Sequence, residues 1–594
     1  MSSALRIIGL LVLAWRKDRT RLTISFLLML LQSAALPLSG SVLGTLTNAA
    51  LAGDTAGASI AAIVAATLVI AALTAGHFAH IFYFELSDLI VLHLQCELIS
   101  LSNDSAGIEH HERPDCADKL QVLREELDRA GSNVLGAVLG SLGLSLAILI
   151  TVILLGMLNA LLLLLPLAAI PPLLLGRRAE KVLANARERA ARPNRLARHL
   201  FSLATDAAPA KELRSCGLEQ EIRRRHSSSW AEASEILWRG EMRAVRLRVA
   251  GQLVFAIAYV AATLLIVVDA VAGRRSIGDI VLVIILAAQV NQQLTAAVTL
   301  HQELLRVAGM MDDMDWVRAL VAQQNSTERL DVPPDSMVSG ITFHDVSFGY
   351  PGADRNILEH LNLRLPAGST VVLVGENGAG KSTLVKLLCG FYAASAGRIE
   401  VDGVDLQRIR LPAWRARISA GFQDFVKFEF LAREVVGIGH LPHIASDSAV
   451  RAALRLAKGE DVIDRLEHGL QTELGRSNAN GVELSGGQWQ KLALGRAMMR
   501  PDPLLLVLDE PTSALDAQAE NSLFERFAEN AKRLGRQTGA ITVLVSHRFS
   551  TVRMADQIIV VAGKGVSQVG THDDLMWQEG LYAELYALQV RAYQ

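Results

Sequence analysis

A run of about 34 uncharged residues, from Leu142 to Leu175, most restricts how this chain can fold. A helix rises about 1.5 Å per residue, so roughly 20 apolar residues cross the ~30 Å hydrocarbon core of a bilayer. The run is too long for one crossing and is most simply two helices. We predict two membrane spans that turn near Gly156 to Asn159, with the first beginning near Val134.

Further apolar stretches in the first 300 residues are long enough to span a membrane. They are Leu22 to about Ala49, Ser59 to about Phe82, Val249 to Val268 and Ile277 to about Val298. A hydrophobic content of 51% is high for a wholly soluble protein. The first half of the chain is therefore predicted to be an all-α domain with six spans, over residues 22–320.

Basic residues set the predicted orientation of these spans. Residues 177–198 and 223–225 are rich in arginine, whereas the predicted loop from Leu51 to Ala58 has no Lys or Arg. The positive-inside rule then places both termini in the cytoplasm of a cell-membrane protein, although Arg274 and Arg275 run against it. Residues 1–21 read as a helix at the membrane surface, because the apolar stretch Ile7 to Trp15 is followed by basic residues.

The polar stretches 82–133 and 176–248 are too long for simple connectors and have helical composition. We expect helices that continue past the membrane and turn back, with tips near His110 to Asp118 and near Thr205 to Leu218. The four cysteines lack CxxC spacing, so neither a zinc site nor a disulfide framework is expected.

The second half reads as a soluble α/β domain over residues 341–594, after a linker at 321–340. An apolar strand leads into a glycine-rich loop and an amphipathic helix, which is the required context of a phosphate-binding loop. Its backbone N–H groups and the helix N-terminus can donate hydrogen bonds to phosphate oxygens. The Lys381 ammonium group can reach the β- and γ-phosphates of ATP, and the Ser382 hydroxyl can ligate Mg²⁺. The predicted nucleotide contacts are Gly375, Glu376, Asn377, Gly378, Ala379, Gly380, Lys381, Ser382 and Thr383.

Two carboxylates follow the apolar run Leu504 to Leu508. Asp509 at the tip of a buried strand is placed to hold Mg²⁺ through water. Glu510 is placed to polarise a water that attacks the terminal phosphate, so it is the predicted catalytic base.

The segment Leu484-Ser485-Gly486-Gly487-Gln488 contains no acid–base pair and no metal-binding cluster, and its two glycines favour close approach of the backbone to a ligand. Together with the phosphate loop, Leu-Asp-Glu, Ser513 to Asp516 and Ser546 to Arg548, in this order, it resembles the ATP-binding-cassette family. The resemblance implies an exporter half-transporter of type I, also called type IV, with a P-loop cassette after the six spans. It also implies that Ser485, Gly486, Gly487 and Gln488 bind ATP held by the phosphate loop of a second subunit.

The same resemblance assigns further roles. Tyr350 matches the aromatic residue that stacks on adenine, and Gln423 matches the glutamine that contacts Mg²⁺. His547 matches the histidine that hydrogen-bonds the γ-phosphate, and Asp516 matches the residue that links the two sites. With Glu510 and Lys381, Gln423 and His547 make up the predicted catalytic set, and Ser382, Gln423 and Asp509 the metal set.

No ATP-handling position is degenerate, which favours a homodimer, while a heterodimer remains open. Phe422 to Gly439, Gly481 to Ala497 and Ala210 to Glu219 are similar to the lantibiotic and bacteriocin exporter branch. The expected cargo is a peptide or other amphipathic molecule, with no nucleic-acid partner. Lipid or glycolipid flipping and multidrug export are alternatives, and an ATP-gated channel or regulator is disfavoured because Glu510 is present.

Overall fold

The computed structural model describes residues 3–130, 134–207, 209–325, 331–353, 355–478, 480–510, 517–546 and 552–593. The chain forms two compact units. The first comprises Met1–Ser100 and Val122–Trp316, and the second comprises Leu101–Gln121 and Val317–Gln594. Within the described ranges, six helical segments are long and apolar enough to cross a membrane, as the sequence predicts.

The helices of the first half have the following bounds, with α3, α5 and α11 each contributing residues to both units. They are α1 Ser3–Lys17, α2 Arg19–Leu51, α3 Thr55–Asn103, α4 Glu109–Glu112, α5 Pro114–Ala130, α6 Val134–Leu158, η2 Ala160–Leu163, α7 Leu164–Ala168, α8 Ile170–Thr205, α9 Ala210–Ser215, α10 Glu219–Val271 and α11 Ile277–Gln324.

The long uncharged run folds as the predicted hairpin. Helix α6 ends at Leu158, and the Asn159 side chain accepts a hydrogen bond from the backbone N–H of Leu161 at 3.0 Å, which caps the next turn. The returning segment is interrupted between α7 and α8. Pro171 and Pro172 lie in the first turn of α8, where a missing N–H costs least.

The turn between α2 and α3 is shorter than predicted. The sequence suggests a loop from Leu51 to Ala58, but α3 already begins at Thr55. The Asp54 carboxylate accepts a hydrogen bond from the backbone N–H of Gly57 at 2.9 Å. This side chain satisfies one of the open donors of the first turn, so Thr55 to Ala58 are helical.

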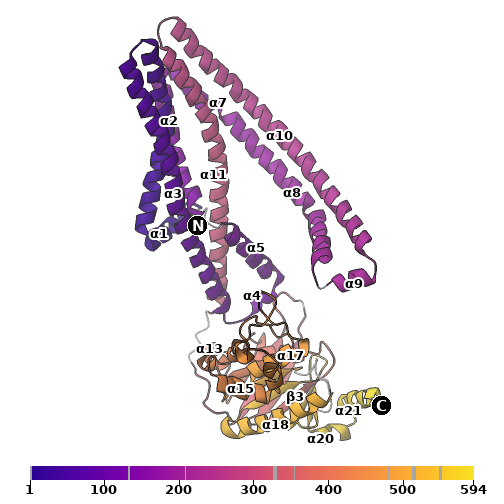
Figure 1. Ribbon diagram of the computed structural model, residues 1–594. Coiled ribbons are helices and arrows are strands. Elements are labelled where there is room, and N and C mark those ends of the chain that lie inside the picture. The colour runs from indigo at the N-terminus through magenta and orange to yellow at the C-terminus, as the bar shows by residue number, and fades with distance from the viewer. Residues whose placement is uncertain are drawn as a thin grey trace. The chain divides into compact units, whose positions relative to one another are not determined.

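Helices α8 and α10 run side by side over most of their length, and both continue far beyond the predicted spans (Figure 1). Small residues allow their close approach. A Cβ atom added at Gly240 would lie 2.5 Å from the Cβ of Ala186, and one at Gly251 would lie 2.8 Å from the Cα of Pro172. The short helix α9 joins α8 to α10 at the tip predicted near Thr205 to Leu218.

The second half contains two sheets. The first, of order β2-β1-β4-β5, is antiparallel; the second, of order β10-β9-β3-β8-β7-β6, is parallel except for its edge strand β10. The strands are β1 Gly340–Phe348, β2 Leu358–Pro366, β3 Thr370–Val374, β4 Ala396–Val401, β5 Val404–Asp405, β6 Ile418–Gly421, β7 Leu505–Asp509, β8 Ile541–Val545, β9 Gln557–Ala562 and β10 Gly565–Gly570.

Helices surround these sheets. They are α12 Lys381–Leu388, α13 Leu411–Arg415, α14 Ala432–Gly437, η3 Leu441–His443, α15 Asp447–Leu456, α16 Glu460–Asp464, η4 Gly469–Gln471, α17 Gly486–Ala497, α18 Ala517–Thr538, α20 His572–Trp577 and α21 Leu581–Tyr593. The fold is thus a six-span helical domain followed by an α/β cassette, which confirms the predicted fold class.

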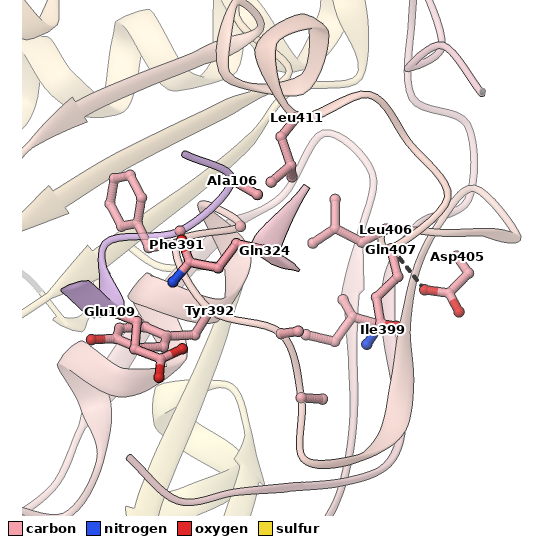
Figure 2. A pocket seen from close by; sticks show the side chains of 14 residues that line it. Ala106, Glu109, Gln324, Phe391, Tyr392, Ile399, Asp405, Leu406, Gln407 and Leu411 are labelled. Carbon is pink, nitrogen blue, oxygen red and sulfur yellow. Dashed lines mark hydrogen bonds between the residues drawn. The ribbon is translucent and has the colours of Figure 1, made fainter. Parts of the chain in front are cut away.

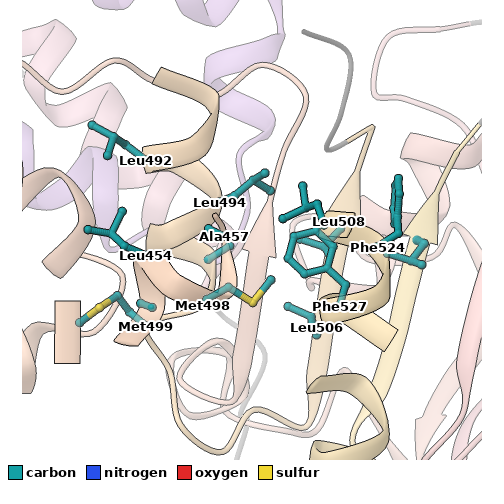
Figure 3. Close-up of a cluster of buried hydrophobic side chains, with 14 of the residues drawn as sticks. Leu454, Ala457, Leu492, Leu494, Met498, Met499, Leu506, Leu508, Phe524 and Phe527 are labelled. Atoms are coloured by element: carbon teal, nitrogen blue, oxygen red, sulfur yellow. The ribbon is translucent and has the colours of Figure 1, made fainter. Parts of the chain in front are cut away.

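The parallel strands β3, β7 and β8 are buried along their whole length, as expected for a sheet covered on both faces. One apolar core packs α15, α17 and α18 against β7, with Leu494, Leu508 and Phe527 at its centre (Figure 3). This packing fixes the carboxyl ends of the strands, where Val374 and Asp509 lie. In parallel α/β sheets that edge is the usual place for a ligand site.

Candidate nucleotide-binding site

The phosphate loop connects β3 to α12 with a backbone that only glycine adopts readily. Gly375, Gly378 and Gly380 have φ of 151°, 82° and 105°. A Cβ atom at Gly375 would lie 2.3 Å from the carbonyl oxygen of Val561. The loop therefore curls tightly against the sheet and leads directly into the N-terminus of α12, where backbone N–H groups suit an anion.

Lys381, the first residue of α12, is buried, with 8% of its surface exposed. Its Nζ donates hydrogen bonds to the carbonyl oxygens of Gly375 and Glu376, both at 2.8 Å. Burial lowers the pKa of Lys381, and the nearby charges of Glu510 and Asp509 oppose that shift. Carbonyl groups of the loop thus hold the Lys381 ammonium group next to the loop backbone.

Asp509 ends the buried strand β7 and is 7% exposed. Burial raises the pKa of Asp509, and the charge of Glu510 raises it further, while a hydrogen bond with Ser382 lowers it. A buried carboxylate under such repulsion is well suited to a cation.

Glu510 follows directly and has φ of 48°, a left-handed conformation that is uncommon for residues other than glycine. Its backbone N–H donates to the carbonyl oxygen of Val545 at 3.0 Å, which keeps the strand end in register. Its Oε2 accepts a hydrogen bond from Nε2 of Gln423 at 2.9 Å. Gln423 and Glu510, 87 positions apart in the chain, thus share one site.

A cavity of about 690 Å³ collects most of the predicted residues. Its lining comprises Tyr350, Ile357, Asn377, Gly378, Gly380, Lys381, Ser382, Thr383, Gln423, Asp509, Glu510 and Val545. Ile357 and Val545 were not anticipated, because an apolar residue beside a strand carries no distinctive sequence signal. Gly375 and Glu376 contribute instead through the carbonyl groups that hold Lys381.

The donor chemistry of this cavity fits Mg²⁺ bound to a nucleotide. The Ser382 hydroxyl, the Asp509 carboxylate and the Gln423 amide offer hard oxygen ligands, which Mg²⁺ prefers. Mg²⁺ usually takes only one or two protein carboxylates and completes its shell with water and phosphate. The glycine loop and the Lys381 ammonium group offer N–H donors and positive charge that fit the phosphates of such a nucleotide.

Tyr350 lies half-buried at the edge of the same cavity. Its hydroxyl is 3.2 Å from Oγ1 of Thr383 on α12, and its ring meets that of Tyr392 edge to face at 5.4 Å between centroids. The ring is therefore held in one orientation beside the phosphate loop, as required of a stacking platform.

The segment from Ser485 to Gln488 forms the start of α17. The Ser485 hydroxyl accepts from the backbone N–H of Gln488 at 3.3 Å, and the Gln488 side chain accepts from the Ser485 N–H at 2.8 Å, a reciprocal capping box. Across the described part of the chain, none of Ser485, Gly486, Gly487 and Gln488 lines the nucleotide cavity. The predicted Asp516 and His547 lie outside the described residues.

Known proteins support this interpretation. Residues 358–513 match the model of the ABC transporter family. The chain is 36% identical over 283 residues to "Uncharacterized ABC transporter ATP-binding protein YwjA" of Bacillus subtilis, covering 48% of this chain and 47% of that protein. It is 36% identical over 249 residues to the "ATP-dependent lipid A-core flippase" of Escherichia coli K12, covering 42% of this chain and 41% of that protein. Each match spans less than half of the relative's length.

A solved structure extends the likeness to both units. "Structure of a bacterial Atm1-family ABC exporter with ATP bound" aligns over 96% of this chain and 99% of that one, with a TM-score of 0.77 and 26% identity. This alignment and the six apolar helices indicate a multi-pass membrane protein. The chain therefore carries an ABC transporter ATP-binding domain and is homologous to ABC exporters.

Proposed function

We propose that this chain is an ATP-hydrolysing exporter that works as a dimer in the cell membrane. The hydrogen bond between Gln423 and Glu510, inside a cavity that also holds Lys381, Ser382 and Asp509, is the observation that carries the proposal. It joins a candidate base, a candidate metal site and a phosphate-binding loop in one place. A site that only bound a nucleotide would not need Glu510.

In this proposal the chain's residues divide the work. The glycine loop and Lys381 would hold the phosphates, and Tyr350 would stack on adenine. Ser382, Gln423 and Asp509 would hold Mg²⁺, which would supply positive charge to stabilise the reacting phosphate. Glu510 accepts a proton from water as the water oxygen bonds to the γ-phosphorus. The bond between that phosphorus and the bridging oxygen breaks, and its electron pair leaves on ADP.

The second subunit closes the site. Ser485 and the N–H groups at the start of α17 would meet the γ-phosphate held by the other subunit, since a helix N-terminus favours an anion. Asp516 and His547 are proposed to act at the same junction. ATP would thus favour the closed dimer, and hydrolysis would reopen it, which allows the six-span unit to alternate between two states. We favour a homodimer, with a heterodimer as the alternative.

The cargo we favour is a peptide or another amphipathic molecule, as in the lantibiotic and bacteriocin branch that the sequence resembles. A second candidate is a lipid or glycolipid, because the lipid A-core flippase of Escherichia coli is among the similar proteins. ATP hydrolysis by the reconstituted protein, measured with added amphipathic peptides or with vesicles containing glycolipid, separates the two. A chain that hydrolyses no ATP in either setting would contradict the proposal.

A further inference from the structure

The 101–121 segment belongs to the same compact unit as the cassette, although more than 200 residues separate them in the chain. The backbone N–H of Ile108 donates to the carbonyl oxygen of Phe391 at 3.3 Å, and Arg415 donates to the carbonyl oxygen of Ala106 at 2.5 Å. Phe391, Tyr392 and Glu109 line a small hollow of about 150 Å³ in this region (Figure 2). The segment is thus bound to the cassette by specific backbone contacts.

Glu112, the last residue of α4, makes a paired contact with the cassette. Its Oε1 accepts from Nζ of Lys386 at 2.6 Å, and its Oε2 accepts from the Tyr392 hydroxyl. The pKa of Glu112 is lowered: burial acts to raise it, but the hydrogen bonds from Lys386 and Tyr392 outweigh that effect. One carboxylate therefore fixes two side chains of the cassette.

Lys386 also lies over an aromatic ring. Its Nζ is 5.1 Å from the ring centroid of Tyr350, within the range of a cation–π contact. Lys386 lies on α12, the helix that begins with Lys381 and Ser382, two of the residues predicted to contact the nucleotide. Tyr350 lines the nucleotide cavity, whereas Lys386 is not among the residues that line it.

We propose that Glu112 and Lys386 are positioning residues for adenine: Lys386, held by Glu112, fixes the Tyr350 ring from its outer side while the base stacks on the cavity side. This rests on the proposed ATP-binding function and adds a role for the 101–121 segment. When the segment is docked, Glu112 restrains Lys386 and the ring is preorganised. When it is displaced, Lys386 can turn to water and the ring keeps only its contacts with Thr383 and Tyr392.

The geometry also requires the coupling to run in both directions. If docking of the 101–121 segment strengthens binding of the base, then binding of the base must strengthen docking by the same factor. The triphosphate, in contrast, is held by Lys381 and the loop, which Glu112 does not touch. The proposal therefore predicts an effect that depends on the base and not on the phosphates.

The test measures two dissociation constants on the full-length protein in detergent, one for ATP and one for inorganic tripolyphosphate, which has no base. Glu112→Gln and Lys386→Met should each weaken ATP binding roughly threefold to tenfold, the scale of a partly shielded cation–π contact. Binding of tripolyphosphate should not change. Lys386→Arg, which keeps the cation over the ring, should restore most of the affinity for ATP.

Asp115→Asn is the matched control, because Asp115 lies in the same segment and pairs with Arg113 rather than with the cassette. It should leave both constants unchanged. The double variant Glu112→Gln/Lys386→Met should bind ATP no more weakly than Lys386→Met alone, since the two residues act in series.

Three outcomes would overturn the proposal. They are equal weakening of ATP and tripolyphosphate binding, additive losses of ATP affinity in the double variant, and an unchanged dissociation constant for ATP in Lys386→Met. These outcomes leave the proposed function standing, because the unmodified protein would still bind ATP. If the unmodified protein binds neither ligand, the proposed function fails and this inference fails with it.

Discussion

Gln423 donates a hydrogen bond from Nε2 to Oε2 of Glu510 at 2.9 Å, and this contact joins the segment after β6 to the end of β7. The Gln423 amide fixes the orientation of the Glu510 carboxylate. The position of the second carboxylate oxygen, Oε1, is therefore fixed as well. An oriented carboxylate beside a phosphate-binding loop is what general base catalysis requires.

Glu510→Gln should bind ATP within about twofold of the unmodified protein and hydrolyse it at least ~100-fold more slowly, because general base catalysis contributes that much or more. Closed dimers should accumulate with ATP. Steady-state ATPase assays and size analysis in detergent measure both effects, with the exposed Glu467→Gln as control. Unaltered ATPase in Glu510→Gln would show that another group is the base.

Lys381→Ala should weaken nucleotide binding itself. A hydrogen bond to a charged group is worth about 1.5–3 kcal/mol, so the dissociation constant for ATP should rise roughly tenfold to a hundredfold. Lys564→Ala removes a cassette lysine that pairs with Glu359 on the surface, and it should have no such effect. Normal ATP affinity in Lys381→Ala would mean that Lys381 does not reach the phosphates.

Gly486 offers a test of the proposed contact between subunits. A Cβ atom added there meets no atom within 4 Å in its own chain, so larger side chains should not disturb the fold. Gly486→Ala and then Gly486→Leu should lower ATP hydrolysis progressively, while the thermal midpoint and ATP binding stay close to normal. Full hydrolysis by Gly486→Leu would rule out a tight contact across the dimer at this position.

The ionised carboxylate of Asp509 should destabilise the folded protein when no metal is bound. Burial raises the pKa of Asp509, so at neutral pH the folded state holds a carboxylate that ionises more easily in the unfolded chain. Asp509→Asn should therefore raise the thermal midpoint in a chelator, by about 2–4 °C. As the pH falls through the raised pKa, the folded protein takes up the proton and the difference should shrink.

Added Mg²⁺ and ATP should reverse the order of stability, because only the unmodified protein has the carboxylate that we propose as a metal ligand. Thermal unfolding with and without Mg²⁺ is the measurement. A lower midpoint for Asp509→Asn in the chelator would contradict the argument from burial.

Local patterns predicted much of this structure. The glycine spacing and Lys381 marked the loop between β3 and α12, and the apolar run before Asp509 marked β7, because short-range sequence dictates backbone conformation there. The length of uncharged runs likewise gave the hairpin around Asn159, because a bilayer sets helix length.

Long-range pairings were beyond such patterns. Glu112 and Lys386 lie 274 positions apart, and neither has neighbours that distinguish it from an ordinary surface charge. The hydrogen bond between Gln423 and Glu510 is similar, since only the family resemblance brought Gln423 to attention. The start of α3 at Thr55 was missed because the capping role of Asp54 was not recognised.

The attachment of residues 101–121 has a practical consequence. The cassette is the natural fragment to purify, yet a fragment beginning near residue 317 lacks Glu112, whose carboxylate binds Lys386 and Tyr392. The surface that residues 101–121 cover would be exposed in this fragment and would favour self-association. Calorimetry on the fragment would then underestimate the affinity for the adenine base. Ligand screening should therefore start from the intact polypeptide.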